Sequence, residues 1–540
     1  METERPPDIT DPDSWERIDQ LLPYADPWTF PLEAFYDLYD ILDQLLSTTT
    51  HTHLEGRRGA GKTVMMVKAY RTIHEQFLKE KGSPPFESAA IFVDLKSDVQ
   101  AIHNDPPQIR ALTIYHQILE YLLTIKSRQE GRKQRRFWGL EDFLDERPNW
   151  FRRTWARWHL GRYKNYLYKW DKVINIKKFQ EKIRYERNFG GTAQLGATFN
   201  PENPLVLSGQ YDASATRNRS QEDFVSGEFT LFSGKVRGYL ERLLDAMQVG
   251  KLIIFLDEWS DSKIGESTQP YLYELLMQTF PAGGRVAIKI ATITGSTKLT
   301  FGAEPPRSQP ISLDSLATND TELHHRLTFM LLRNLRIVSK GKFPAKFMSA
   351  EEESNRFPAF RKTFFSDEDA LSEFLLASEN LPRQMLLLFL SLSRIHKKYG
   401  SRISAPFVRM AARDYFYHSH LKRIERDPIQ DGVFGEIIRK GSRVVDIELA
   451  PRLRETVINF VEDGILFRCD HILPDRYKRY YLCYPAESHR LYNSYEGAEQ
   501  GFTRFENISI ESIGNCGSYE RPPEVRLSEL IPVLFVEEKK

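Results

Sequence analysis

Residues 56–63 decide the fold, and they read Gly-Arg-Arg-Gly-Ala-Gly-Lys-Thr, which has the spacing G-x-x-x-x-G-K-T. A β-rich segment, residues 49–54, leads into this stretch, and residues 64–78 after it carry apolar side chains at helical spacing. A strand, a loop and a helix in that order point successive backbone N–H groups at a bound anion. The sequence therefore predicts a phosphate-binding loop at the start of an α/β domain.

The residue types in this loop favour a nucleotide. The glycines allow the backbone to approach phosphate closely, Lys62 can reach the β- and γ-phosphates, and the Thr63 hydroxyl can ligate Mg²⁺. ATP or GTP with Mg²⁺ is the working hypothesis, and a glycine-rich turn that ends in Lys-Thr by chance is the alternative. The residues that we expect to contact the nucleotide are Gly56, Arg58, Gly59, Ala60, Gly61, Lys62 and Thr63.

A second motif supplies acidic groups. Residues 252–258 form an apolar run, Leu-Ile-Ile-Phe-Leu, that ends in Asp257 and Glu258. After a buried strand, the first acid can hold Mg²⁺ and the second can polarise an attacking water as a base. A strand that ends in a solvated acidic turn is the alternative. The separation of 195 positions between Lys62 and Asp257 indicates a large insertion between the two halves of the site.

Two further groups are candidates for the same site. Residues 286–293 are an apolar strand pattern, and Thr292, Thr294 and Ser296 lie at its end, where a hydroxyl could hydrogen-bond a γ-phosphate or simply stabilise the strand end. Arg383 follows Pro382 at the start of an apolar helix. This arginine could reach a bound phosphate from a lid, or it could be a surface cation.

Charge is distributed unevenly along the 540 residues. The formal net charge is +1, but residues 131–190 hold 17 Lys/Arg against 7 Asp/Glu. These cations could bind nucleic acid or an acidic protein, with exposed aromatic rings stacking on unpaired bases. Alternatively, Trp150, Trp155 and Trp158 form the core of a small helical subdomain with a solvated cationic face. Five of the eight tryptophans lie in this segment: Trp138, Trp150, Trp155, Trp158 and Trp170.

Composition favours a cytoplasmic protein. The three cysteines have no C-x-x-C spacing, which argues against a disulfide framework or a structural zinc site. No apolar run approaches the roughly 18 residues of a membrane span. The polar, acidic N-terminus argues against a secretory signal.

Apolar strands alternate with helical patterns, which predicts an α/β fold with a parallel sheet covered by helices on both faces. At this length we expect three or four domains. A helix is expected over residues 31–46. The expected units are an N-terminal arm (1–30), a nucleotide-binding domain (31–317) with a basic, Trp-rich and then Gly/Ser-rich insertion at about 128–235, a helical lid (318–400), a winged-helix domain (401–495) and a tail (496–540).

Together these motifs resemble the AAA+ ATPases of the origin-recognition initiator clade. Residues 255–260 (Phe-Leu-Asp-Glu-Trp-Ser), 269–272 (Gln-Pro-Tyr-Leu) and 289–291 (Lys-Ile-Ala) look like the bacterial ATPases described as origin-recognition-like. The resemblance covers about residues 25–490 apart from the insertion. The winged helix rests on the order of helices and strands alone.

The resemblance implies roles for individual residues and a homo-oligomeric state. Lys62 and Thr63 would bind phosphate and Mg²⁺, and Asp257 would bind Mg²⁺. The remaining roles would be Glu258 as base, Thr294 or Thr292 as first sensor, Arg383 as second sensor, and Arg307 as the arginine supplied to a neighbouring subunit.

The expected function is an Mg²⁺-dependent, ATP-hydrolysing AAA+ switch that acts on DNA or on a partner assembly, in genome maintenance or antiviral defence. Origin binding need not carry over, because site chemistry transfers better than a fold's role. The rival is a nucleotide-binding scaffold with little turnover that docks a partner through the insertion or the winged helix.

Overall fold

The computed structural model describes a little over half of the chain in detail. The predicted N-terminal arm, most of the basic segment and the Gly/Ser-rich segment lie outside the described residues, as does Ser296. The described ranges are 35–79, 86–99, 106–123, 140, 153–171, 228–261, 264–294, 297–300, 306–313, 320–338, 364–399, 402–448, 450, 452–468, 477–493 and 523–526.

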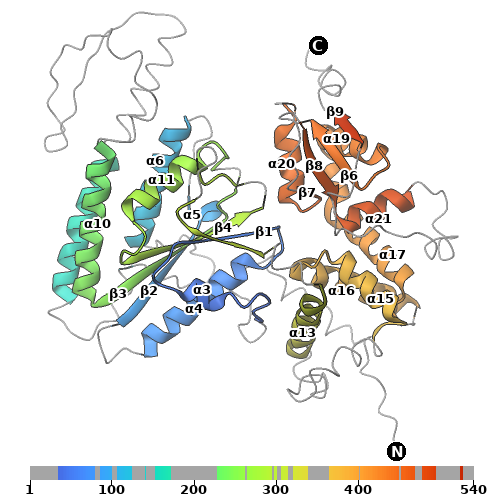
Figure 1. The fold of residues 1–540 in the computed structure, drawn as a ribbon, viewed down its shortest axis with the longest axis horizontal. Coiled ribbons are helices and arrows are strands. Elements are labelled where there is room, and N and C mark those ends of the chain that lie inside the picture. The colour runs from blue at the N-terminus through green and yellow to red at the C-terminus, as the bar shows by residue number, and fades with distance from the viewer. Residues whose placement is uncertain are drawn as a thin grey trace, which may run out of the picture.

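A five-stranded parallel sheet forms one half of the molecule (Figure 1), in the order β2-β3-β4-β1-β5. This confirms the predicted parallel α/β sheet. The register sets Asp94 opposite Asp257 and Gly56 opposite Ile293, so the carboxyl ends of these strands meet at one edge. The strands are β1 (Thr52–Gly56), β2 (Phe86–Asp94), β3 (Val249–Asp257), β4 (Val286–Ile293) and β5 (Gln309–Ser312).

Helices cover both faces of this sheet. Alternate residues of β3 enter two separate cores: Ile253 and Phe255 face α4 (Lys62–Lys79), while Ile254 packs with helices of the other face. Strands buried on both sides read as continuous apolar runs, which is why residues 252–256 show no alternation. The helices of the other face are α6 (Pro107–Leu123), α10 (Glu228–Met247) and α11 (Gln269–Thr279).

The prediction of a helix over residues 31–46 is wrong for residues 35–41, which are not helical. Only α3 (Leu42–Leu46) is helical there. The Asp37 carboxylate accepts a hydrogen bond from the Leu42 backbone N–H at 2.8 Å, and Asp40 has a φ of 54°, in the left-handed region. This turn folds Phe35 and Leu38 into the core beside the phosphate loop.

The second half of the molecule holds helices and a smaller sheet (Figure 1). One of its helical stretches consists of α17 (Ala405–Phe416), a π-helical turn η4 (Tyr417–Leu421) and α18 (Lys422–Ile424). The smaller sheet has the order β7-β8-β6-β9. We call residues 402–526 the C-terminal domain. The remaining elements are α5 (Leu95–Asp98), α13 (Asp320–Val338), α15 (Glu368–Ala377), α16 (Pro382–Tyr399), α19 (Pro428–Arg439), β6 (Val444–Glu448), α20 (Arg454–Glu462), β7 (Leu466–Arg468), β8 (Tyr477–Leu482), α21 (Tyr484–Asn493) and β9 (Glu524–Arg526).

Part of the basic segment is packed into the core that α6, α10 and α11 form on one face of the sheet. A helix over residues 153–171 buries Leu160, Tyr163 and Leu167 in the same cluster as α6 and α10. Trp170 packs on Phe232 of α10, with ring centroids 3.9 Å apart. In Figure 1 this helix lies beside α10 at the edge of the molecule. The alternative that places Trp150, Trp155 and Trp158 in a core is wrong for Trp155 and Trp158, which are exposed, while Trp150 lies outside the described residues.

None of the helices described here combines the length and apolar character that crossing a membrane requires.

The buried Lys289 of β4 anchors the segment that precedes β1. Its Nζ donates to the backbone oxygens of Gln44 and Thr50 and to Thr52 Oγ1, each at 3.0 Å. Burial lowers the pKa of this amine to about 8. The lysine therefore fixes α3, and with it the turn at residues 35–41, against the sheet.

We expect Lys289→Met, which keeps the volume but removes the donor, to lower the free energy of unfolding by about 2–4 kcal/mol, because three acceptors lose their partner. Urea denaturation measures this change. Lys235→Met on the exposed face of α10 is the matched control and should shift stability by less than about 0.5 kcal/mol. Equal effects of the two substitutions would contradict the anchoring role.

Candidate functional site

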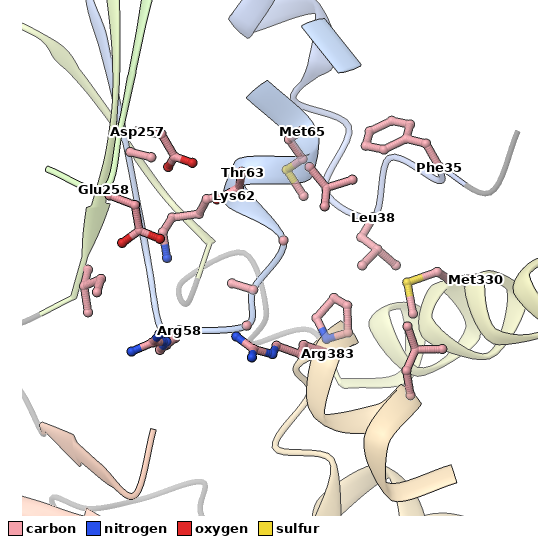
Figure 2. Close-up of a pocket in the computed structure, with 18 of the residues that line it drawn as sticks. Phe35, Leu38, Arg58, Lys62, Thr63, Met65, Asp257, Glu258, Met330 and Arg383 are labelled. Atoms are coloured by element: carbon pink, nitrogen blue, oxygen red, sulfur yellow. The ribbon is translucent and has the colours of Figure 1, made fainter. Parts of the chain in front are cut away.

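A cavity of about 250 Å³ lies where the phosphate loop meets the carboxyl edge of the sheet. Figure 2 shows charged side chains at one end and apolar side chains at the other. The charged and polar lining residues are Arg58, Lys62, Thr63, Asp94, Lys96, Asp257, Glu258, Ser260, Asn334 and Arg383.

The glycines of the loop are required by its geometry. Gly59 and Gly61 have φ values of 93° and 92°, which L-residues rarely adopt. A Cβ on Gly59 would also come within 3.3 Å of Arg383 Cβ, and one on Gly56 within 3.1 Å of Leu313 Cβ. The loop backbone is therefore free to curl around an anion, as the spacing of residues 56–63 predicts.

Lys62 and Thr63 begin α4 and line the cavity. Lys62 Nζ donates to the backbone oxygens of Gly56 at 2.6 Å and of Arg57 at 3.0 Å. Figure 2 shows the side chains of Lys62 and Glu258 converging between α4 and the end of β3. The ammonium group therefore lies at the charged end of the cavity.

Asp257 ends β3 and is buried at the wall of the cavity. Burial, followed by the charge of Glu258, raises the pKa of Asp257 to about 7, while a hydrogen bond with the Thr63 side chain acts in the opposite direction. A carboxylate beside a hydroxyl is an oxygen donor set that Mg²⁺ accepts, and a bound cation would favour the charged carboxylate. The residues present therefore fit a Mg²⁺ ion.

Glu258 has a φ of 56°, which is unusual for a residue with a side chain. This backbone reversal directly after β3 turns its carboxylate into the cavity, where Figure 2 shows it beside Lys62. Strained backbone of this kind persists where the surroundings impose it and clusters at functional sites.

The end of β4 differs from the sequence expectation. Thr292 is buried and its hydroxyl donates to the Leu54 backbone oxygen at 3.4 Å, so it serves the sheet. Thr294 donates its backbone N–H to Gly56 O at 3.4 Å, and it is not among the described residues that line the cavity. The lining hydroxyl is Ser260, whose Oγ accepts from the Ile293 N–H at 2.9 Å.

Arg383 reaches the phosphate loop from α16. Its backbone N–H donates to Gly59 O at 3.3 Å, and its side chain lines the cavity. Figure 2 shows Arg383 and Arg58 at the same end of the cavity. The structure thus brings Arg383 to the loop, as a lid arginine requires. Arg307 is more than half exposed, pairs with Glu274 at 3.2 Å and does not line the cavity.

The apolar end of the cavity was not foreseen from the sequence. It joins the turn at residues 35–41, the first turn of α4 and the facing sides of α13 and α16. Such a slot suits the flat face of a nucleobase. Its apolar lining includes Phe35, Leu38, Met65, Met330 and Leu386.

Two arginines of the phosphate loop contact the other half of the molecule. Arg57 donates to Glu379 O at 3.0 Å and to the Tyr481 hydroxyl at 2.9 Å, and its guanidinium lies 5.0 Å from the Phe467 ring centroid. Arg58 donates to Glu462 O, at the end of α20, at 2.5 Å. The loop at residues 56–63 is therefore bound directly to the C-terminal domain.

Glu379 is the buried centre of this contact. Its carboxylate accepts from Arg443 at 2.9 Å and from the Tyr484 N–H, and it lies 3.9 Å from Arg57. Burial raises the pKa of Glu379, while the two arginines oppose the rise. Glu379 also has a φ of 56°, so the turn before α16 is held in an uncommon conformation.

No family model matches the chain, and no curated protein matches it. Among solved structures, it is similar to the Walker-type ATPase paby2304 of Pyrococcus abyssi, with a TM-score of 0.31 and 12% identity over 85% of this chain and 96% of that chain. It is also similar to the Aeropyrum pernix ORC2 protein in ADPNP-ADP complexes, with a TM-score of 0.26 and 10% identity over 91% and 95%. TM-scores this low do not identify the fold. The parallel sheet, with the glycine loop of residues 56–63 between β1 and α4, shows an α/β P-loop fold.

We expect Glu379→Gln to lower the free energy of unfolding by about 3 kcal/mol, because buried Arg443 loses its counter-charge while the shape of the side chain stays the same. Chemical denaturation of the full chain gives the value. Glu524→Gln removes an exposed pair with Arg526 and should cost less than about 1 kcal/mol. A change no larger than that of the control would show that the buried pair is not a structural joint.

Proposed function

We propose that the protein is a Mg²⁺-dependent AAA+-type ATPase that works as a nucleotide-controlled switch. One observation carries the proposal: the phosphate loop, the Thr63–Asp257 pair and Glu258 line a single cavity with an apolar slot at its other end. These groups come from strands and helices 195 positions apart, and their convergence matches the needs of phosphoryl transfer to water.

Each side chain has a role in this proposal. The backbone N–H groups of residues 56–63 and Lys62 bind the phosphates, and Arg58 and Arg383 add positive charge beside them. Glu258 orients the attacking water and accepts its proton. Thr63 and Asp257 would hold Mg²⁺, and a bound Mg²⁺ would supply positive charge beside the phosphate oxygens. The base occupies the slot beside Phe35, and ATP is the nucleotide we expect there.

Thr294 and Thr292 are less well supported as a first sensor than they were from sequence, because neither is a described lining residue of the cavity. Ser260 is the hydroxyl that the geometry offers in their place. Arg307 remains our proposal for an arginine that completes the site of a neighbouring copy in a homo-oligomer, and its exposure supports that role.

The switch would act through the helices α13–α16 as a lid and through the C-terminal domain. Strands β6, β7 and β8 form an antiparallel sheet with α19 and α20 packed in the same core, an arrangement that supports a winged helix. We propose that this domain and the basic segment engage DNA or a partner assembly in the cytoplasm, in genome maintenance or antiviral defence.

The rival is a nucleotide-binding scaffold with little turnover. Two observations favour it. The Lys62 ammonium group already donates hydrogen bonds to two backbone oxygens of the loop. Arg57 and Arg58 donate hydrogen bonds to the C-terminal domain. A loop held in this way could bind nucleotide mainly to lock or release the C-terminal domain.

Turnover separates the two functions. We expect Glu258→Gln to lower kcat by about 10²–10⁴-fold with ATP binding retained, because only the base is lost. Lys62→Ala should weaken binding itself. Phosphate release and equilibrium binding of labelled ATP and GTP measure both. If the unmodified protein hydrolyses ATP no faster than Glu258→Gln, while still binding it, the scaffold is correct.

A second measurement addresses the switch. Hydrogen exchange of α20 and β7 should change when ATP is added, and Arg57→Ala should abolish this response while leaving ATP affinity within about threefold, because Arg57 contacts the C-terminal domain and does not line the cavity. Arg423→Ala, which removes an exposed pair with Asp463 in the same domain, is the control. A response that survives in Arg57→Ala would exclude this route.

A further inference from the structure

Exposed aromatic side chains are concentrated on the helix at residues 153–171. Among the described residues, the large aromatic or apolar side chains that are strongly exposed are Trp155 (49%), Trp158 (54%), Tyr168 (60%) and Tyr417 (41%). Three of these four lie on the one helix. Exposed tryptophan is costly in water, so a cluster of this kind indicates a surface that contacts a partner.

The exposed face is regular. Trp155, Trp158, Arg162 and Lys169 follow at intervals of three, four and seven, which places them on one side of the helix. The opposite side of the helix is buried against α6 and α10, in the same core as α11, and carries Ala156, Leu160, Tyr163 and Leu167. We call the four exposed residues the indole stripe.

The two indoles of the stripe are held in place. The His159 ring lies edge-on to both, with centroids 5.0 Å from Trp155 and 4.8 Å from Trp158. The guanidinium of Arg162 lies 4.8 Å from the Trp158 ring centroid. Rings fixed in this way lose little further freedom when they bind, which favours affinity.

His159 itself is buried, and neither ring nitrogen has a hydrogen-bond partner. Burial, and next the charges of Arg162 and Arg242, lower its pKa, so the ring is neutral at pH 7 and adds no charge of its own. Its contribution is therefore to position the indoles.

The charge around the stripe is positive. The helix at residues 153–171 carries five Lys/Arg and a single carboxylate, Asp171. On α10, Arg242 is close enough to act on His159, and the nearby Asp245 is already paired with Arg285. A partner that fits this surface combines negative charge with exposed flat rings.

We propose that the indole stripe binds single-stranded nucleic acid, with unpaired bases stacked on Trp155 and Trp158 and phosphates paired with Arg162 and Lys169. A duplex has the charge but hides its base faces, and an acidic protein has the charge without a regular supply of rings. This inference deepens the proposed function by naming its partner. Binding of the strand does not depend on ATP hydrolysis, so the inference rests on the proposed ATPase only where a bound strand changes the rate of hydrolysis.

The test is the fluorescence anisotropy of a labelled oligothymidylate of about 20 nucleotides with the full chain, without nucleotide, at about 50–200 mM salt. Trp155→Ala/Trp158→Ala should weaken binding at least about 10-fold, because stacking is lost. Trp155→Phe/Trp158→Phe keeps flat rings and should retain most of the affinity. Arg162→Gln/Lys169→Gln should reduce the slope of log affinity against log salt by about 1.4.

Tyr168→Ala, at an exposed aromatic residue of the same helix that lies outside the indole stripe, is the matched control and should leave binding unchanged. The proposal is overturned by no binding at low salt, by a double alanine variant that binds like the unmodified protein, or by an equal loss in the control. Duplex DNA that binds as tightly as the single strand, and whose binding the double alanine variant weakens equally, would also overturn it.

Unfolding curves of the variants show that each is folded. Phosphate release without DNA, measured on the same preparations, keeps this result separate from the proposed function. An unmodified protein that binds the strand through the stripe but hydrolyses no ATP would contradict only the ATPase. A double alanine variant that hydrolyses ATP normally but binds as before would contradict only the stripe.

Discussion

The ion pairs of the buried Glu379 carboxylate hold the two halves of the molecule together. The carboxylate lies between Arg443 of the C-terminal domain and Arg57 of the phosphate loop, in a turn that leads directly into Pro382 and Arg383. An unpaired carboxylate in this place would be strongly unfavourable, so the loop and the C-terminal domain, which supply the two arginines, are held beside the turn that leads into α16. The candidate site consequently forms at the junction of three parts of the chain.

Local motifs made much of this site predictable. The spacing of residues 56–63 fixes a loop that only glycine can follow at Gly59 and Gly61, and an apolar run that ends in Asp257 fixes an acid at the carboxyl edge of a parallel sheet. The loop and the acid at the strand end are each determined by residues adjacent in sequence, which is why they could be predicted. The proximity of Arg383 to the loop was also expected, while its role as a sensor stays a prediction.

Features that depend on distant packing were not predictable. Helical spacing of apolar residues suggested a helix over 31–46, but the carboxylate of Asp37 and the left-handed Asp40 replace it with a turn that lines the apolar end of the cavity. Ser260 lines the cavity just after the chain reverses at Glu258, whereas Thr294, which follows β4, is not among the described lining residues. Asp94 gave a usable signal, as an acid at the end of an apolar strand, but its position beside Asp257 follows from sheet order alone.

The pairing of β2 with β3 has a consequence for synthesis of the chain. These strands are neighbours over their full length, yet about 150 residues separate the end of one from the start of the other. At about 5–20 residues per second, β2 leaves the ribosome some 8–30 s before its partner. Throughout that interval the continuous apolar run of residues 89–93 and the unpaired backbone groups of β2 lack their neighbouring strand, so nascent chains should depend on chaperones until residue 257 has emerged.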